Sequence, residues 1–310
     1  MAIASRPSEI TLPAEIGRWP TVLAYLVDKF PRIDAEIWQQ RMLDGKVSWF
    51  AGDKIGPDTA FQPSRRLCYF REVPAEPKVP FAHQILFQND HLLVVAKPHF
   101  LPVTPGGDFV NECLLERVRR DTGIADLAPL HRLDKETAGL VLFSCHAQSR
   151  PLYHQLFAEG TITKAYLAVA ELPTHLQELT IGQQWQVKNR LEKADPRFLM
   201  QMVAGEDNAW STIQLLARQQ QSAFQQLGLF QLWPHTGKTH QLRLHMQAIG
   251  MPILHDKYYP KLLPKQQDFQ AMPLQLLAQQ LQFVDPVCGT SRHFSSPQTL
   301  AAWPGDWVSP

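Results

Sequence analysis

Residues 129–145 read PLHRLDKETAGLVLFSC, a polar turn that runs directly into a short apolar segment. Residues 140–143 are all apolar, and together with their neighbours they have the composition of a buried strand. Asp134 therefore lies at the rim of a predicted buried sheet, a position that suits a catalytic carboxylate. The same residues also fit an ordinary solvated turn, with Asp134 and Glu136 as turn formers and Arg132 as a surface partner.

A second segment, residues 160–172, reads GTITKAYLAVAEL and alternates in side-chain character as a strand does. The alternation places Lys164 and Tyr166 on one face, so the Tyr166 ring is available to a cleft. A tyrosine in a strand also fits a half-buried packing position whose hydroxyl reaches water. The residues alone leave both interpretations open.

A third segment, residues 232–253, reads LWPHTGKTHQLRLHMQAIGMPI and predicts a helix. We expect Thr239 to be its N-cap and Gly250 to end it. Arg243 then lies one turn into the helix, where its guanidinium can project into a cleft. A surface arginine lying along the helix is the alternative interpretation.

Two other kinds of site are disfavoured by the same segment. Its GKT triplet is not a phosphate-binding P-loop, because that motif needs a glycine at position 232, where the chain has leucine. His240 and His245 are five residues apart, about 140° out of phase on a helix, so they predict structural histidines and not a metal-binding pair. The four cysteines are far apart and form no CxxC pair, which argues against a zinc ribbon.

The composition is that of an ordinary globular protein of 310 residues, with 45% hydrophobic and 19% charged residues. No apolar run is long enough to span a membrane, and the first residues lack the apolar core of a signal peptide, which predicts a cytoplasmic protein. The net charge of +1 means that affinity for nucleic acid would have to come from local clusters of basic residues.

Residues 71–80 carry three prolines and alternating charges, so we expect a linker there, between a small module at 1–70 and a larger domain at 81–310. The small α/β module is predicted to hold helices at 21–30 and 35–45 and a hairpin at 45–55 with its turn at Gly52 and Asp53. The larger domain mixes strands and helices without strict alternation, which predicts an α+β fold with a mixed, largely antiparallel sheet and flanking helices. Residues 218–226, RQQQSAFQQ, are expected to be a polar hairpin loop.

Together and in this order, the three segments resemble the RluA-type pseudouridine synthases, which isomerise uridine in RNA. The family signature HRLDxxTSGLLL reads HRLDKETAGLVL here, and its KxYxAxVxG strand reads KAYLAVA. The signature PxTGRTHQIRVHLxxxGxPIxGDxxYP reads PHTGKTHQLRLHMQAIGMPILHDKYYP. VVAKPHFLPVTPGG resembles the family's KPxGxxVxP segment, and WSTIQL its AxTxY strand. The likeness spans residues 81–297.

The resemblance implies a pseudouridine synthase fold and a site-specific isomerase acting on ribosomal or transfer RNA. It implies that Asp134 is the catalytic aspartate, Tyr166 the cleft tyrosine and Arg243 the arginine that pairs with the aspartate. RNA contacts are expected from Arg132, Lys135, Lys164, Lys238, His240 and Lys257, with Lys188, Arg190 and Lys193 as further candidates. Lys238 stands where the family has arginine, so it keeps the charge but loses the bidentate fork.

The chemistry agrees with these roles. Detaching uracil from ribose and rejoining it through carbon needs an ionised carboxylate, and an arginine within about 4–6 Å favours the ionised form. The reaction consumes no electrons or phosphate, so no cofactor, nucleotide or metal is expected. Tyr166 can stack on uracil and is placed to act as a general base. A base inside folded RNA must be extruded to reach such a pocket.

Alternatives remain at this stage. The chain could be a non-catalytic RNA-binding protein that has kept the fold, or a hydrolase that uses Asp134 and Glu136 as a carboxylate pair. The first module distantly resembles an alpha-L RNA-binding module, but Asp34 and Glu36 stand where that module carries polar and basic residues, so RNA contact and a structural role are equally compatible. A monomer is the default expectation. The target uridine, and whether the carboxylate attacks base or ribose, do not follow from the sequence.

Overall fold

The computed structural model describes residues 1–173, 179–222, 225–264 and 272–304. The chain divides into two compact units, one formed by Met1–Pro77 with Gly106–Asn111 and the other by Lys78–Pro105 with Glu112–Pro310. The predicted linker is therefore partly ordered within the first unit. Strand β5 (Glu72–Val73) falls inside residues 71–80 and pairs with β1 (Ala2–Ile3). The prolines of this stretch do not prevent the pairing, since they follow the two paired residues and no sheet hydrogen bond needs their missing N–H groups.

The first unit contains the two expected helices, α1 (Val22–Lys29) and α2 (Ala35–Leu43). They cover a sheet in the order β2 (Ser8–Thr11), β4 (Arg66–Tyr69), β3 (Val47–Trp49). Leu26, Trp38 and Leu67 are fully buried between them.

The expected hairpin forms only in part. Its turn closes by a bond from Trp49 N to Asp53 O, but the second arm contributes only an isolated bridge between Ser48 and Lys54. Strand β3 instead pairs along its length with β4, which lies further along the chain than the second arm of the predicted hairpin.

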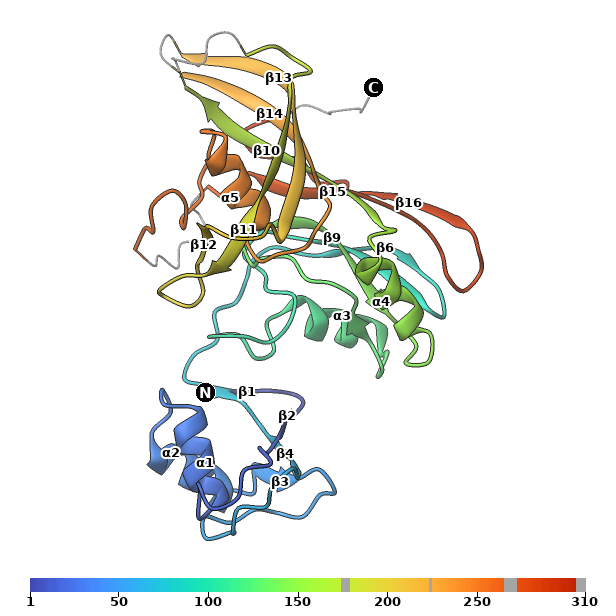
Figure 1. Cartoon of the computed structure of the whole chain (residues 1–310). Coiled ribbons are helices and arrows are strands. Elements are labelled where there is room, and N and C mark those ends of the chain that lie inside the picture. The colour runs from blue at the N-terminus through green and yellow to red at the C-terminus, as the bar shows by residue number, and fades with distance from the viewer. Residues whose placement is uncertain (174–178, 223–224, 265–271, 305–310) are drawn as a thin grey trace. The chain divides into compact units, whose positions relative to one another are not determined.

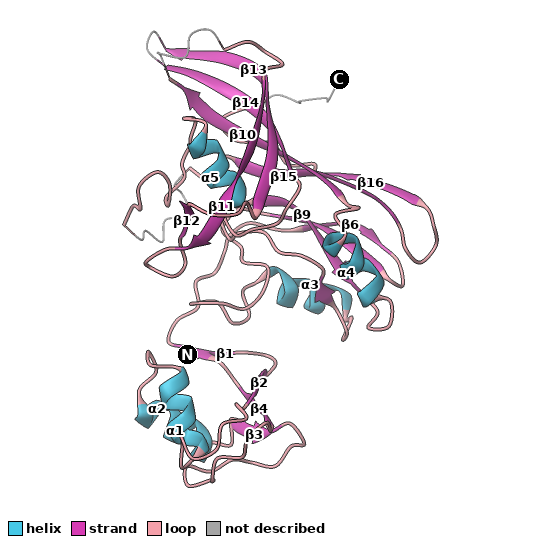
Figure 2. Cartoon of the chain, in the orientation of Figure 1, coloured by secondary structure: helices cyan, strands magenta, loops and turns pink. Residues whose placement is uncertain are grey.

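The second unit is built on an 11-stranded sheet, whose strands run in the order β12-β11-β13-β14-β10-β15-β9-β7-β6, with β16 on β15 and β8 on β9 (Figures 1 and 2). The strands are β6 (Gln84–Gln88), β7 (Leu92–Lys97), β8 (Ala128–Pro129), β9 (Ala138–Ser144), β10 (Thr163–Leu172), β11 (Gln184–Lys193), β12 (Met200–Val203), β13 (Ala209–Ser222), β14 (Gln225–Pro234), β15 (Leu276–Val284) and β16 (Ser291–Ser295). The helices are α3 (Leu114–Thr122), α4 (Arg150–Ala158) and α5 (Gln241–Ala248). The sheet is therefore mixed and largely antiparallel, as predicted.

Two apolar clusters hold helices against the two halves of this sheet. Tyr153 of α4 packs with Leu92 and Leu140 in the half that contains β7 and β9. Leu242 and Met246 of α5 pack in the cluster that includes residues of β10, β13 and β14. Each helix is thus held in place by its apolar residues. The first turn of α5 lies beside the beginning of β10 and the end of β14.

The two halves of the sheet meet where β9 pairs with β15. This pairing is parallel, whereas the other pairings described in this sheet are antiparallel. It consists of two residue pairs, Leu277 with Ala138 and Ala278 with Gly139. Gly139 has a φ of +116°, and a Cβ there would lie 2.3 Å from the Ala278 carbonyl oxygen. Only glycine fits this close approach, so the glycine of residues 129–145 fixes the point at which the polar turn enters the sheet.

The glutamine-rich stretch differs from the expectation of a hairpin loop. Residues 218–222 form the end of β13 and pair with β14, so they are strand. Polar side chains fit because the ends of the two strands extend past the apolar core, where backbone pairing still satisfies their amide groups. The turn itself lies outside the described residues. Among those described, no helix is long and apolar enough to cross a membrane.

Candidate active site

A cavity of about 170 Å³ lies where the polar turn, β10, the end of β14 and the start of α5 come together. It gathers most of the residues singled out in the sequence: Arg132, Asp134, Lys164, Tyr166, Lys238, His240 and Arg243. Lys135 and Lys257 do not line it. The Lys135 ammonium lies 3.3 Å from Glu136 Oε1, and the Lys257 ammonium lies 6.0 Å from the centre of the Phe100 ring.

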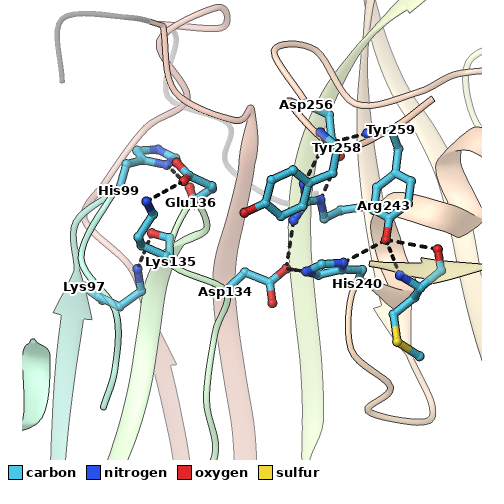
Figure 3. Close-up of polar contacts among 11 residues, drawn as sticks. Lys97, His99, Asp134, Lys135, Glu136, His240, Arg243, Asp256, Tyr258 and Tyr259 are labelled. Atoms are coloured by element: carbon cyan, nitrogen blue, oxygen red, sulfur yellow. Dashed lines mark hydrogen bonds and ion pairs between the residues drawn. The ribbon is translucent and has the colours of Figure 1, made fainter. Parts of the chain in front are cut away.

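Arg243 is the most buried charged group of the cavity, with 1% of its side chain exposed. Its Nη1 donates to Asp134 Oδ2 at 3.3 Å, so the structure joins the two residues across 109 positions of sequence. Its closer partner is Asp256, which accepts from Nε at 2.8 Å and from Nη2 at 2.6 Å (Figure 3). Burial opposes the charge on Arg243, but the hydrogen bonds and charges of Asp256 and Asp134 raise its pKa above the ordinary value.

Asp256 had no role assigned from the sequence. Besides the two bonds from Arg243, it accepts from the backbone N–H groups of Tyr258 at 2.8 Å and Tyr259 at 3.1 Å. The Tyr258 ring lies 4.6 Å from the guanidinium carbon. An aspartate whose side chain bonds to the backbone two residues later is a recognisable turn pattern, but nothing local indicated that both of its oxygens would also accept from Arg243.

The start of α5 differs from the expected Thr239 cap. His240 is the capping residue, with a left-handed backbone at φ +54° and no side-chain capping bond. The Gln241 amide oxygen instead accepts from Lys238 N at 3.1 Å, which holds the preceding loop. The positive φ turns the chain sharply at His240, so Thr239 lies outside the helix.

His240 lines the cavity and also contacts the protein interior. Its Nδ1 lies 2.8 Å from the Tyr259 hydroxyl, and its Nε2 lies 3.8 Å from Asp134 Oδ2. Burial lowers the pKa of His240, although the charge of Asp134 opposes that shift. Burial thus favours the neutral form of the ring, and its Nε2 edge lies beside the carboxylate.

Tyr166 lies half-buried in the wall of the cavity. In β10 it pairs with Leu232 of β14 and with Ala278 of β15, next to a bulge between Ala165 and Tyr166. Burial, and then the charge of Asp134, raise the pKa of Tyr166 above the ordinary value of a phenol. The side chain is thus a neutral phenol facing the cavity.

The turn that carries Asp134 is bound on its buried side by Lys97, a residue to which the sequence analysis assigned no role. Lys97 lies at the end of β7 and is fully buried. Its ammonium donates to the carbonyl oxygens of Pro98, Leu101 and Lys135, at 3.0, 2.7 and 3.2 Å. Burial lowers the pKa of Lys97 to about 7, while the charges of Glu136 and Asp134 act in the opposite direction.

Two histidines complete the support of this turn. His99 Nδ1 lies 2.6 Å from the Glu136 carbonyl oxygen, to which it must donate. His131 Nε2 accepts from Leu142 N at 3.1 Å, and burial lowers the pKa of His131 to about 3. The only signal for this support was the lysine–proline pair of the segment that resembles KPxGxxVxP.

No group of three or more metal-ligating side chains suited to hold a metal ion occurs among the described residues. The donors around the cavity are instead arranged about one partly exposed carboxylate. A 28% exposed Asp134 next to a buried guanidinium can act on a substrate that enters the cavity.

Comparison with known proteins places this geometry in a family. Residues 91–248 match the family model described as RNA pseudouridylate synthase. The Dual-specificity RNA pseudouridine synthase RluA of Haemophilus influenzae is 32% identical over 227 residues, covering 72% of this chain and 94% of the relative. The Ribosomal large subunit pseudouridine synthase C of Rickettsia bellii is 27% identical over 254 residues, covering 79% and 81%.

Solved structures agree on the fold. Human RNA Pseudouridylate Synthase Domain Containing 1 superposes with a TM-score of 0.56 at 20% identity, covering 72% of this chain and 86% of the other. Human RNA Pseudouridylate Synthase Domain Containing 4 gives 0.50 at 23% identity. The chain therefore belongs to the RluA family of RNA pseudouridine synthases and is an isomerase whose substrate is RNA.

Proposed function

We propose that this enzyme isomerises a specific uridine in ribosomal or transfer RNA and that Asp134 is its catalytic carboxylate. The observation that carries the proposal is the contact of Asp134 Oδ2 with Arg243 Nη1 at 3.3 Å, inside a cavity walled by Tyr166. The relative named for the large ribosomal subunit supports ribosomal RNA as one substrate class.

The reaction needs little beyond these groups. The bond from ribose C1′ to uracil N1 breaks, a bond from C1′ to C5 forms, the C5 proton leaves and N1 gains a proton. No electrons are gained or lost overall. Arg243 places a positive charge 3.3 Å from Asp134, and its two bonds to Asp256 fix the position of the guanidinium beside that carboxylate.

The raised pKa of Tyr166 argues against a phenolate that waits to accept the C5 proton. A neutral phenol can still stack on the uracil ring and donate one hydrogen bond. We therefore assign Tyr166 the positioning of the base, in place of the general-base role considered from the sequence.

RNA binding is assigned first to the basic residues that line the cavity. Arg132, Lys164 and Lys238 can contact the phosphates next to an extruded nucleotide, and His240 can donate to it. Extrusion of a base costs a few kcal/mol, which such contacts offset. Lys135 and Lys257 lie outside the cavity, and we assign them to more distant phosphates.

The test uses RNA that carries tritium at uridine C5. Incubation of the protein with ribosomal and transfer RNA isolated from cells that lack it releases tritium if C5 is the new attachment point. Mapping of pseudouridines in the same RNAs, before and after incubation, identifies the target. Binding of RNA without tritium release would show that the chain is a non-catalytic RNA-binding protein, and release of free uracil would show a hydrolase.

A further inference from the structure

A row of alternating basic and aromatic side chains crosses the outer strands of the large sheet. Lys188 of β11 is paired directly with Trp210 of β13, and the Lys188 ammonium lies 4.4 Å from the centre of the indole. The His235 ring, just after β14, stacks on the same indole with centroids 4.0 Å apart and planes 28° apart. Because β13 lies between β11 and β14 (Figure 1), Lys188 and His235 flank the indole from opposite sides.

The His235 ring is held in a fixed orientation. Its Nε2 lies 2.9 Å from the Thr212 hydroxyl, and its backbone N–H donates to the Trp210 carbonyl at 3.0 Å. The residue is nevertheless exposed, so the ring is accessible although Trp210 covers one face. An aromatic ring that is rigid, exposed and backed by another ring is the arrangement on which single-stranded nucleobases stack.

The His235 ring is a flat surface that lies within electrostatic range of two ammonium groups, those of Lys164 and Lys188. Burial, and then the charges of Lys164 and Lys188, lower the pKa of His235, so the ring is neutral near pH 7. Phosphates on either side of a base stacked on His235 can contact these two ammonium groups.

The row continues into the candidate active site. Lys164, whose charge reaches His235, lines the cavity with Asp134, and so do Pro234 and Thr236 on either side of His235. Trp210 is connected to the same loop, since its backbone N–H donates to the Thr236 hydroxyl at 2.9 Å and its backbone carbonyl accepts from the Gln241 side-chain amide at 2.9 Å. A nucleotide next to the one in the cavity can thus reach His235 without a long connection.

We propose that His235, backed by Trp210, is a stacking platform for a nucleobase that flanks the target uridine, with Lys188 and Lys164 contacting the adjoining phosphates. This inference rests on the proposed function, because it assumes that the cavity receives the extruded uridine. It assigns His235 and Trp210 to the recognition of single-stranded RNA around the target.

The experiment compares two fluorescein-labelled probes of equal charge, an oligouridylate of about 12 nucleotides and an abasic ribose-phosphate chain of the same length. The ratio of their dissociation constants measures how much the bases contribute. The proteins compared are wild type, His235→Ala, His235→Phe and Lys188→Gln, each checked for an unchanged melting temperature. Anisotropy is measured at several salt concentrations.

We expect the preference of the wild type for the probe with bases to fall about tenfold in His235→Ala and to be restored in His235→Phe, which keeps a flat ring. Lys188→Gln should weaken both probes equally and reduce the salt dependence. An unchanged ratio in His235→Ala, or a ratio in His235→Phe as low as in His235→Ala, would overturn the proposal. Because the assay needs no isomerisation, it fails independently of the tritium test.

Discussion

Arg243 joins two carboxylates whose surroundings differ in almost every respect. Asp256 is 1% exposed and is held by two bonds from the guanidinium and two from backbone N–H groups. Asp134 is 28% exposed and receives one longer bond, at 3.3 Å, from the same arginine. Figure 3 shows Asp134 between two groups of supporting residues, while Asp256 lies entirely within one of them.

The difference shows how one arginine can serve two purposes. The bidentate pair with Asp256 fixes the guanidinium and compensates its burial. The remaining Nη1 then donates to Asp134, which stays partly exposed in the cavity. A single strong pair with Asp134 would have stabilised the protein but would have left the carboxylate occupied.

The largest effect is expected from Asp134→Asn. Loss of the negative charge should reduce pseudouridine formation by roughly 10³-fold or more, while the melting temperature stays near that of the wild type because the side chain is partly exposed. Tritium release and thermal unfolding measure the two quantities. Activity near the wild-type level would remove Asp134 from the chemistry.

Asp256→Asn makes the same chemical change in the other carboxylate that binds Arg243. Unlike Asp134→Asn, it should lower the stability of the protein. It leaves a buried guanidinium with a weakened partner, so the free energy of unfolding should fall by about 3–5 kcal/mol. Urea titration of this variant beside Asp134→Asn tests the comparison directly. Equal stability of the two variants would show that the two carboxylates do not differ as described.

Lys97→Met asks whether the Asp134 turn depends on its buried ammonium. The change leaves the carbonyls of Pro98, Leu101 and Lys135 without this donor, and we expect a loss of about 1–3 kcal/mol in the free energy of unfolding. Turnover should fall as well, since the turn is less well fixed. Lys97→Arg is not a suitable control at this buried site, so Lys135→Met, which changes a more exposed ammonium on the same turn, provides the comparison for the free energy of unfolding.

The smallest effect at neutral pH is expected from His131, whose contribution to stability depends on pH. Its pKa is about 3 in the folded protein and about 6.5 when unfolded, so between these values the unfolded chain binds more protons and stability falls as the pH falls. The fall attributable to His131 is at most about 1.4 kcal/mol for each pH unit. His131→Gln can still accept from Leu142 N and should show a flatter profile between pH 6 and 4. Parallel profiles would contradict the shift.

Local patterns were enough for much of this structure. The strand at 138–144, the helices α1 and α2 and the strand that carries Tyr166 follow from patterns of apolar residues, and ordered motifs pointed to Asp134, Tyr166 and Arg243. The partners of these residues did not follow, because Asp256 and Lys97 act through contacts that only the folded chain creates. The prediction of Thr239 as the N-cap was wrong for a related reason, since the cap is His240, with a left-handed backbone, and its ring contacts Tyr259, 19 residues away.

The junction at Gly139 has a consequence for modularity. Asp134 comes from the stretch just before β9, whereas Arg243 and Asp256 come from beyond β14, and only two residue pairs connect these halves in parallel register. Neither half alone contains both Asp134 and Arg243. A chimera that joins one half to the other half of a distant homologue would therefore have to preserve the register of these two residue pairs. Otherwise Asp134 and Arg243 would no longer face each other.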